Sequence, residues 1–331
     1  MPSGLSAASA RRLGGVLVSV VTVGAITAWA LRQPAPTFPS SAEHLGLLAA
    51  ALAVYCAATL LRAWRWHVIL RLDGIAHRRR DAAGLLLVGY AGNTVLPARG
   101  GELLRVVVLS RLVGARKRQV VGSIIAERGL DAGVLAALFV ALTFAGVAGS
   151  PAGDLPAILA GVAVVAATVG GAVYLQLRRR GRLAAFADRV RPVASASRPL
   201  WAPTGVWLAA LTGVVWLLEG VIFSLVASSL GLHVSVLEGL FLDVLASFFA
   251  LLPAAPGYVG TFDAAMLFGL HALDVRGGDA VAFTLLVRFV LFVPITLAGG
   301  ILLVTRYGGL TQLRRARASA RAEGGEARAA A

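Results

Sequence analysis

Long apolar segments separated by short polar ones dominate this chain. Six of them are long enough to cross a hydrocarbon core, which takes about 20 helical residues; they are 13–30, 45–61, 120–147, 155–177, 205–230 and 281–304. We expect each to be a membrane-spanning helix. The first is expected to stay uncleaved, because its apolar run is longer than the roughly 7–15 residues of a signal-peptide core.

Four shorter apolar segments come in two pairs, each interrupted by proline and glycine. The first pair, 83–96 and 103–113, breaks at Pro97, and the second, 236–252 and 258–273, breaks at Pro253. At 1.5 Å per residue, such segments reach only part of the way across a bilayer. We therefore expect two re-entrant hairpins, with two tight pairs of full spans as the alternative.

The order of these segments predicts an internal repeat. A long helix, a broken hairpin and a second long helix occur at about 43–147 and again at about 204–304, separated by one span. One intervening span inverts the second unit relative to the first. In transporters built from inverted repeats, the binding site lies where the discontinuous helices of the two units meet.

Composition agrees with an all-α polytopic membrane protein, since 58% of the residues are hydrophobic and only 14% are charged. Lysine and arginine outnumber aspartate and glutamate by 31 to 16. The bases gather in short inter-helix segments and the tail, which is typical of membrane orientation and disfavours nucleic-acid binding. We expect a plasma-membrane protein with both termini cytoplasmic, an integral domain at 1–308 and a disordered basic tail at 309–331.

Ionisable residues inside the apolar segments are the candidate binding groups. Each costs roughly 2.5–3.5 kcal/mol at mid-membrane, so they must face a cavity or one another. Guanidinium pairs bidentately with phosphate, which favours a phosphate held by arginines. The alternative is buried ion pairs: Arg105 with Glu102, Arg128 with Asp131, and Arg288 with Asp263 or Glu219. The predicted substrate-binding set is Asn93, Arg99, Glu102, Arg105, Glu127, Arg128, Asp131, Glu219, Pro253, Gly257, Tyr258, Gly260, Asp263 and Arg288.

Other features are weaker. The segment 62–66, Arg-Ala-Trp-Arg-Trp, closes the second predicted span. It is interpreted as an interface anchor, with a direct role in binding a lipid headgroup as the alternative. Cys56 is the only cysteine and the histidines are scattered, so we expect no disulfide, metal site or cofactor. Without a catalytic constellation, we expect that the chain is not an enzyme.

The motifs around the two breaks resemble a known family. Asn93-x-x-Leu-Pro-x-Arg-Gly-Gly-Glu-x-x-Arg105, Glu127-Arg128-x-x-Asp131, Leu252-Pro-x-x-Pro-Gly-x-x-Gly260 and Arg288 occur in this order. They resemble the flippase-like transmembrane domain of bacterial lysylphosphatidylglycerol synthases, over roughly residues 10–305. The resemblance implies movement of lipids between leaflets, such as aminoacylated phospholipids or polyprenyl-phosphate-linked molecules. Because only a short tail follows Val304, we expect no aminoacyl-transferase domain and no lysine transfer.

The sequence therefore predicts a lipid translocase whose partners are membrane lipids with phosphate headgroups. Two alternatives stay open: a membrane subunit of a lipid-modifying transferase with a soluble catalytic partner, and a secondary transporter of a small polar solute. A homo-oligomer is also compatible with the sequence.

Overall fold

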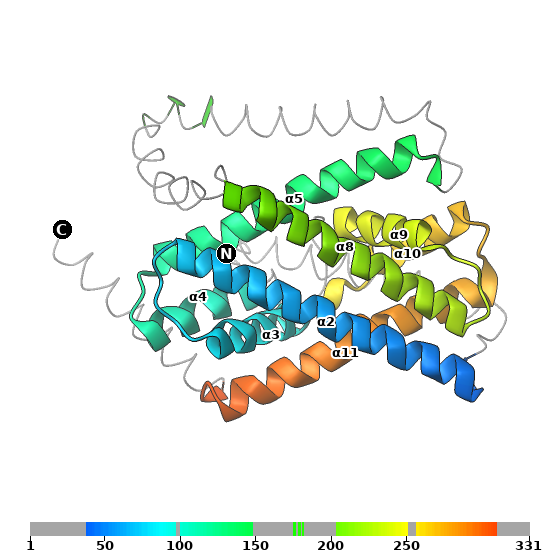
Figure 1. Ribbon diagram of the computed structural model, residues 1–331, viewed down its shortest axis with the longest axis horizontal. Helices are drawn as coiled ribbons and strands as arrows, with labels where there is room; N and C mark the ends of the chain where they lie inside the picture. The colour runs from blue at the N-terminus through cyan, green and yellow to red at the C-terminus, as the bar shows by residue number, and fades with distance from the viewer. Residues whose placement is uncertain are drawn as a thin grey trace, which may run out of the picture.

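The computed structural model describes residues 38–96, 100–147, 203–250 and 256–309, with short pieces at 175–176, 178–179 and 181. Within these residues every regular element is helical (Figure 1). The predicted span 13–30, most of the predicted span 155–177, and the tail from residue 310 lie outside the described residues.

Four long helices coincide with four of the predicted spans. They are α2 (Ala42–Leu72), α5 (Lys117–Phe144), α8 (Pro203–Ser229) and α11 (Gly277–Thr305). Helices α2, α8 and α11 are long and apolar enough to cross a membrane. Helix α2 does not end near residue 61 as predicted but continues to Leu72, and this extension changes the environment of its arginines.

Two helical hairpins occupy the places predicted for the broken segments. The first is α3 (Arg79–Val95) with α4 (Gly100–Val113), and the second is α9 (Val236–Phe249) with α10 (Thr261–Ala272), which follows the short helix η4 (Pro256–Tyr258). The hairpins enter the bundle from opposite ends, and their tips meet near its middle (Figure 1). A Cβ added at Gly257 would lie 3.5 Å from the carbonyl oxygen of Thr94, so the two tips are in contact.

Glycine lets the two arms of the first hairpin lie side by side. A Cβ at Gly101 on α4 would fall 1.7 Å from the carbonyl oxygen of Gly89 on α3, and one at Gly92 would fall 2.6 Å from Cα of Gly101. Small residues allow such close helix contact in membrane proteins, where van der Waals packing drives association. The hairpin therefore depends on residues that carry no side chain.

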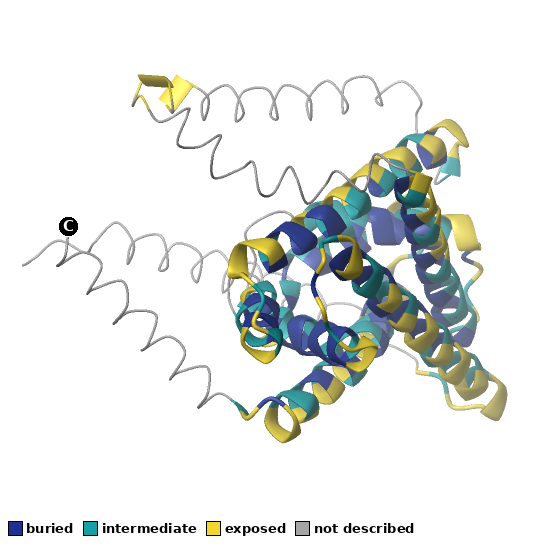
Figure 2. Cartoon of the chain, turned by 60° about the vertical axis from the view of Figure 1, so that its left-hand side comes forward, coloured by how far each residue is buried: buried dark blue, intermediate teal, exposed yellow. Residues whose placement is uncertain are grey.

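The buried residues form two main cores, one around each hairpin, and α2 contributes to both. The core around the first hairpin includes Trp66, Leu85 and Leu109, whereas the core around the second includes Phe223 and Phe283. Buried residues line the inward faces of the helices and exposed residues the outward faces (Figure 2). The exposed residues include many large apolar side chains, such as Leu60, Phe144, Leu297 and Ile301. A surface of that kind is suited to lipid rather than water.

Outside the interior, the basic residues of the described helices gather at one end of the bundle. At this basic end Nη2 of Arg306, just after α11, lies 2.6 Å from Oδ1 of Asp81 in the first turn of α3. The ion pair joins the end of α11 to the start of α3. The arginines and lysine of this end are Arg71, Arg78, Arg79, Arg80, Arg111, Arg116, Lys117, Arg118 and Arg306. Among the described helix ends at the other side, Arg276 is the sole arginine or lysine, beside Glu43, Glu238, Asp274 and Asp279. Loops on opposite sides of a membrane commonly differ in this way in their content of lysine and arginine.

Candidate functional site

A polar cavity of about 220 Å³ lies where the tips of the two hairpins meet. Its wall is built from α2, α3, α4, α5, α8, α9, η4 and α11, so both hairpins and all four long helices contribute. Of the predicted binding residues, those that line it are Asn93, Glu102, Arg128, Asp131, Glu219 and Tyr258. The sequence analysis thus singled out six of the residues that form this wall.

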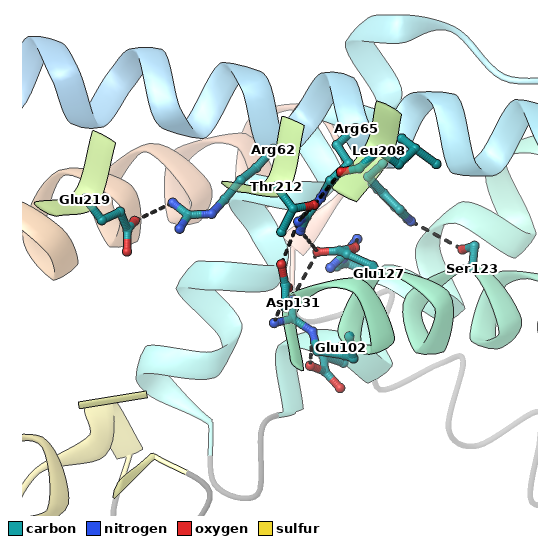
Figure 3. Close-up of polar contacts among 12 residues, drawn as sticks. Arg62, Arg65, Glu102, Ser123, Glu127, Asp131, Leu208, Thr212 and Glu219 are labelled. Carbon is teal, nitrogen blue, oxygen red and sulfur yellow. Dashed lines mark hydrogen bonds and ion pairs between the residues drawn. The ribbon is translucent and has the colours of Figure 1, made fainter. Parts of the chain in front are cut away.

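The fully buried carboxylate of Glu127 is the centre of an ion-pair cluster behind the cavity wall (Figure 3). Its Oε2 lies 2.5 Å from Nη2 of Arg105, and its Oε1 lies 3.1 Å from Nη2 of Arg128 and 3.7 Å from Nη2 of Arg65. Three arginines around one carboxylate would repel each other without it. Glu127 therefore holds α2, α4 and α5 together by charge.

Arg65, which the sequence assigned to an interface anchor, is buried inside the bundle with a side chain 1% exposed. Its Nη1 donates to Oδ1 of Asp131 at 2.5 Å and to Oγ1 of Thr212 at 2.9 Å (Figure 3). Trp66 is likewise buried and lies under the guanidinium of Arg105, 3.9 Å from ring centroid to Cζ. The anchor interpretation is wrong for both residues, because α2 continues to Leu72 and places them in the interior.

Arg128 is the arginine of this cluster that lines the cavity. Its side chain is 37% exposed, against 1% for Arg65 and Arg105. Its contacts with Glu102 and Asp131 are long, at 3.4 Å and 3.3 Å. The Arg128 guanidinium therefore contacts several carboxylates at once, and part of it remains exposed to the cavity.

The ion pairs differ in part from those that spacing suggested. Arg128 contacts Asp131, as expected. Arg105 does not pair with Glu102; it pairs with Glu127 on α5, and Glu102 contacts Arg128 instead. Contacts between helices decide these partners, and spacing within one helix does not reveal them.

Arg288 fixes the tip of the second hairpin. It holds the Asp263 carboxylate through Nε and Nη2, at 2.5 Å and 2.8 Å, and Nη1 donates to the carbonyl oxygen of Gly257 at 3.1 Å. Asp263 also accepts the amide of Gly260 at 2.9 Å, which caps α10. Arg288 does not line the cavity but positions Tyr258, which does. Glu219, the other partner suggested for Arg288, pairs instead with Arg62 of α2.

The first hairpin has a matching side-chain cap. Oδ1 of Asn93 accepts the amide of Gly101 at 3.0 Å, and so satisfies a free N–H in the first turn of α4. In both tips, then, a polar side chain of the predicted set stabilises the start of the second arm. The predicted residues Arg99 and Pro253 lie outside the described residues.

A second arginine, which the predicted set omitted, faces the cavity from α2. Nη1 of Arg62 lies 2.5 Å from Oε1 of Glu219 on α8 (Figure 3). Asp243 on α9 lies beside Glu219, close enough for a side-chain hydrogen bond. Arg62 and Asp243 were not in the predicted set. Each is a charged residue inside an apolar helix with no residue of opposite charge one helical turn away, and that pattern could have identified them.

The charges of the described interior are nearly balanced. Five arginines (Arg62, Arg65, Arg105, Arg128 and Arg288) meet six carboxylates (Glu102, Glu127, Asp131, Glu219, Asp243 and Asp263). An anion entering the cavity would compete with carboxylates for guanidinium groups, and its own hydroxyl or amino groups could in turn donate to those carboxylates. No group of three or more potential metal ligands occurs among the described residues.

Comparison with known proteins gave two matches. The family described as Lysylphosphatidylglycerol synthase TM region matches residues 13–299. A UPF0104 membrane protein of Methanothermobacter thermautotrophicus is 24% identical over 269 residues, which cover 71% of this chain and 78% of that protein. No solved structure matched the chain.

Proposed function

The chain belongs to the lysylphosphatidylglycerol synthase transmembrane region family, and we propose that it moves a lipid with a phosphate headgroup between the leaflets of the plasma membrane. The observation that carries the proposal is the polar cavity between hairpin tips that enter from opposite ends of the bundle. Such a cavity gives a headgroup polar partners at a depth where lipid offers none. The apolar outer faces of the helices would meanwhile stay in contact with acyl chains.

In this proposal Arg128 and Arg62 bind the phosphate. Both line the cavity, and both come from helices outside the hairpins. Glu102, Asp131 and Glu219 line the same space and would accept hydrogen bonds from hydroxyl or amino groups of the headgroup. Arg105, Glu127, Asp263 and Arg288 would act by holding the helices and the second tip in place. The chain would need no catalytic chemistry of its own for this activity.

We further propose that the basic end of the bundle is cytoplasmic and that the hairpins are re-entrant. Helix α4 has 14 residues and α10 has 12, which at 1.5 Å per residue gives lengths of about 21 Å and 18 Å. Both are shorter than a hydrocarbon core of about 30 Å. A cysteine at Ala76, near the basic end, should resist a membrane-impermeant maleimide on intact cells, whereas one at Asp274 should react. The opposite result would reverse the orientation.

Leaflet exchange in reconstituted vesicles tests the proposed function. Vesicles of phosphatidylcholine with a trace of fluorescent phosphatidylglycerol should lose label to an external quencher faster with the protein than without it. Removing one charge-assisted hydrogen bond costs about 1.5–3 kcal/mol, so Arg128→Ala should slow exchange roughly tenfold to a hundredfold. Arg118→Ala is the matched control, because it removes an exposed arginine from the same helix.

Two results would refute the proposal. One is exchange no faster than in protein-free vesicles. The other is equal exchange in Arg128→Ala and wild type. Uptake of a small polar solute without lipid exchange would point instead to a secondary transporter, and co-purification of a soluble catalytic chain would point to a subunit of a lipid-modifying transferase.

A further inference from the structure

Two buried carboxyl groups lie next to each other beside the cavity, and one of them pairs with an arginine. Glu219 on α8 is 6% exposed and Asp243 on α9 is 5% exposed. The two lie within reach of a side-chain hydrogen bond. Arg62 from α2 pairs with Glu219 at 2.5 Å. Glu219 lines the cavity, whereas Asp243 lies behind it.

A hydrogen bond between two carboxyl groups requires a proton, because an ionised carboxylate can only accept. Charge leads to the same conclusion, since two ionised carboxylates beside one arginine would leave a negative charge without a partner in an apolar interior. An unpaired buried charge is costly, and such a group takes up a proton instead. The Oδ2 atom of Asp243 has no hydrogen-bond partner among the described residues, which suits a neutral carboxyl better than a carboxylate.

Among the described residues, no arginine or lysine other than Arg62 pairs with these two carboxyl groups. Arg62 and Tyr55, both of α2, lie near Glu219, but the Tyr55 hydroxyl donates its hydrogen bond to the carbonyl oxygen of Leu291 at 2.7 Å. Tyr90 of α3 lies near Arg62. The other cavity arginine, Arg128 of α5, contacts Glu102, Glu127 and Asp131. Arg288 of α11 is occupied by Asp263 of α10.

We propose that Glu219 and Asp243 form a proton-binding site whose occupancy is linked to phosphate binding at Arg62. The inference rests on the proposed function, since the phosphate would belong to the lipid headgroup. With the cavity empty, the pair holds one proton between its two carboxyls and Arg62 neutralises the remaining charge. When a phosphate takes Arg62, Glu219 loses its partner and the pair takes up a second proton from water in the cavity. When the phosphate leaves, that proton returns to water and Arg62 returns to Glu219.

The consequence is that a proton travels with each headgroup. Linkage is reciprocal, so phosphate binding favours protonation and protonation favours phosphate binding to the same degree. Uptake of one proton per phosphate makes the lipid affinity rise up to about tenfold for each unit of falling pH, over the range where the pair titrates. A pH gradient could then drive net movement of lipid.

The test counts protons on binding. Short-chain phosphatidylglycerol is titrated into the purified full chain by calorimetry, in buffers of different ionisation enthalpy, and the dependence on buffer gives the protons taken up per lipid. We expect about one for wild type and for the control Asp279→Asn, which removes an exposed carboxylate of α11. The double variant Glu219→Gln/Asp243→Asn replaces both carboxyls by amides that can hydrogen-bond each other, and it should take up none. A value near zero in wild type, or an unchanged value in the double variant, overturns the inference.

Other outcomes separate the inference from the function on which it rests. Lipid binding without proton uptake overturns the proton site and leaves the translocase proposal standing, whereas proton uptake without leaflet exchange does the reverse. The same proton count with inorganic phosphate, but no binding of phosphatidylglycerol, overturns the lipid assignment. If the double variant does not fold, infrared spectroscopy decides. Wild type should show the carbonyl stretch of a protonated carboxylic acid at neutral pH, and Asp243→Asn should lack it; its absence from wild type overturns the inference.

Discussion

Glu127→Gln is the substitution that tests the charge cluster most sharply. The carboxylate is 0% exposed and lies within 3.7 Å of three arginines. Glutamine keeps the shape but removes the charge, so those arginines would repel one another with only Glu102 and Asp131 left to balance them. Breaking a buried ion pair from one side costs about 3–5 kcal/mol. At about 1.4 °C per kcal/mol for a chain of this length, the apparent melting temperature in detergent should fall by roughly 4–7 °C.

Two further variants make the reasoning refutable. Glu102→Gln removes a carboxylate that is 28% exposed and 3.4 Å from Arg128, so it should cost about 1 kcal/mol or less. Arg105→Met in the Glu127→Gln background removes one of the uncompensated arginines and keeps the contact with Trp66, so it should restore part of the lost stability. Equal melting temperatures for Glu127→Gln and wild type, or a further fall in the double variant, would show that Glu127 is not the centre of the cluster.

Three other changes have defined outcomes. Gly101→Ala should separate the arms of the first hairpin and prevent purification of a monodisperse protein, because the new Cβ would lie 1.7 Å from a backbone oxygen; Gly129→Ala, with nothing within 4 Å, should be harmless, and equal behaviour of the two would contradict the packing argument. Asp263→Asn should release Arg288 and loosen the tip of the second hairpin by the same loss of about 3–5 kcal/mol, so the amides of residues 257–260 should exchange at least about a hundredfold faster. Unchanged protection of these amides would refute the role of the Arg288–Asp263 pair. Burial raises the pKa of Asp73, just beyond α2, from 3.8 to about 6, which favours its neutral form in the folded state, so stability should fall as pH rises from about 4 to 6. Asp73→Asn should remove that fall, and identical pH–stability curves for the variant and wild type would exclude a contribution of Asp73.

Periodicity and proline placement predicted the helices well, because both act locally. The breaks at Pro97 and Pro253 correctly separated α3 from α4 and α9 from α10. The end of α2 was misplaced, since arginine and tryptophan are compatible both with a membrane interface and with a polar interior. Only the packing of Arg65 against α5 and α8 distinguishes the two.

The site was predictable as a set of buried charges but not as a set of pairs. Glu127 and Asp131 share a helix face by spacing, yet their partners Arg105 and Arg65 come from other helices. The Glu219–Asp243 pair joins α8 to α9 across a contact between Gly220 and Gly239 that no sequence spacing encodes. The meeting of the two hairpin tips, which creates the cavity, depends in the same way on tertiary packing.

The most direct test of headgroup binding is to find which part of a lipid enters the cavity. A photoreactive benzoylphenylalanine placed at Tyr90, in the cavity wall, is compared with one at Leu60, which is exposed on the outer face of α2. After irradiation in phosphatidylglycerol vesicles, mass spectrometry locates the point of attachment on the lipid. If the cavity binds the headgroup, the label should attach to the glycerol headgroup at position 90 and to acyl chains at position 60. Acyl-chain attachment at both positions, or no lipid captured at position 90, would contradict it.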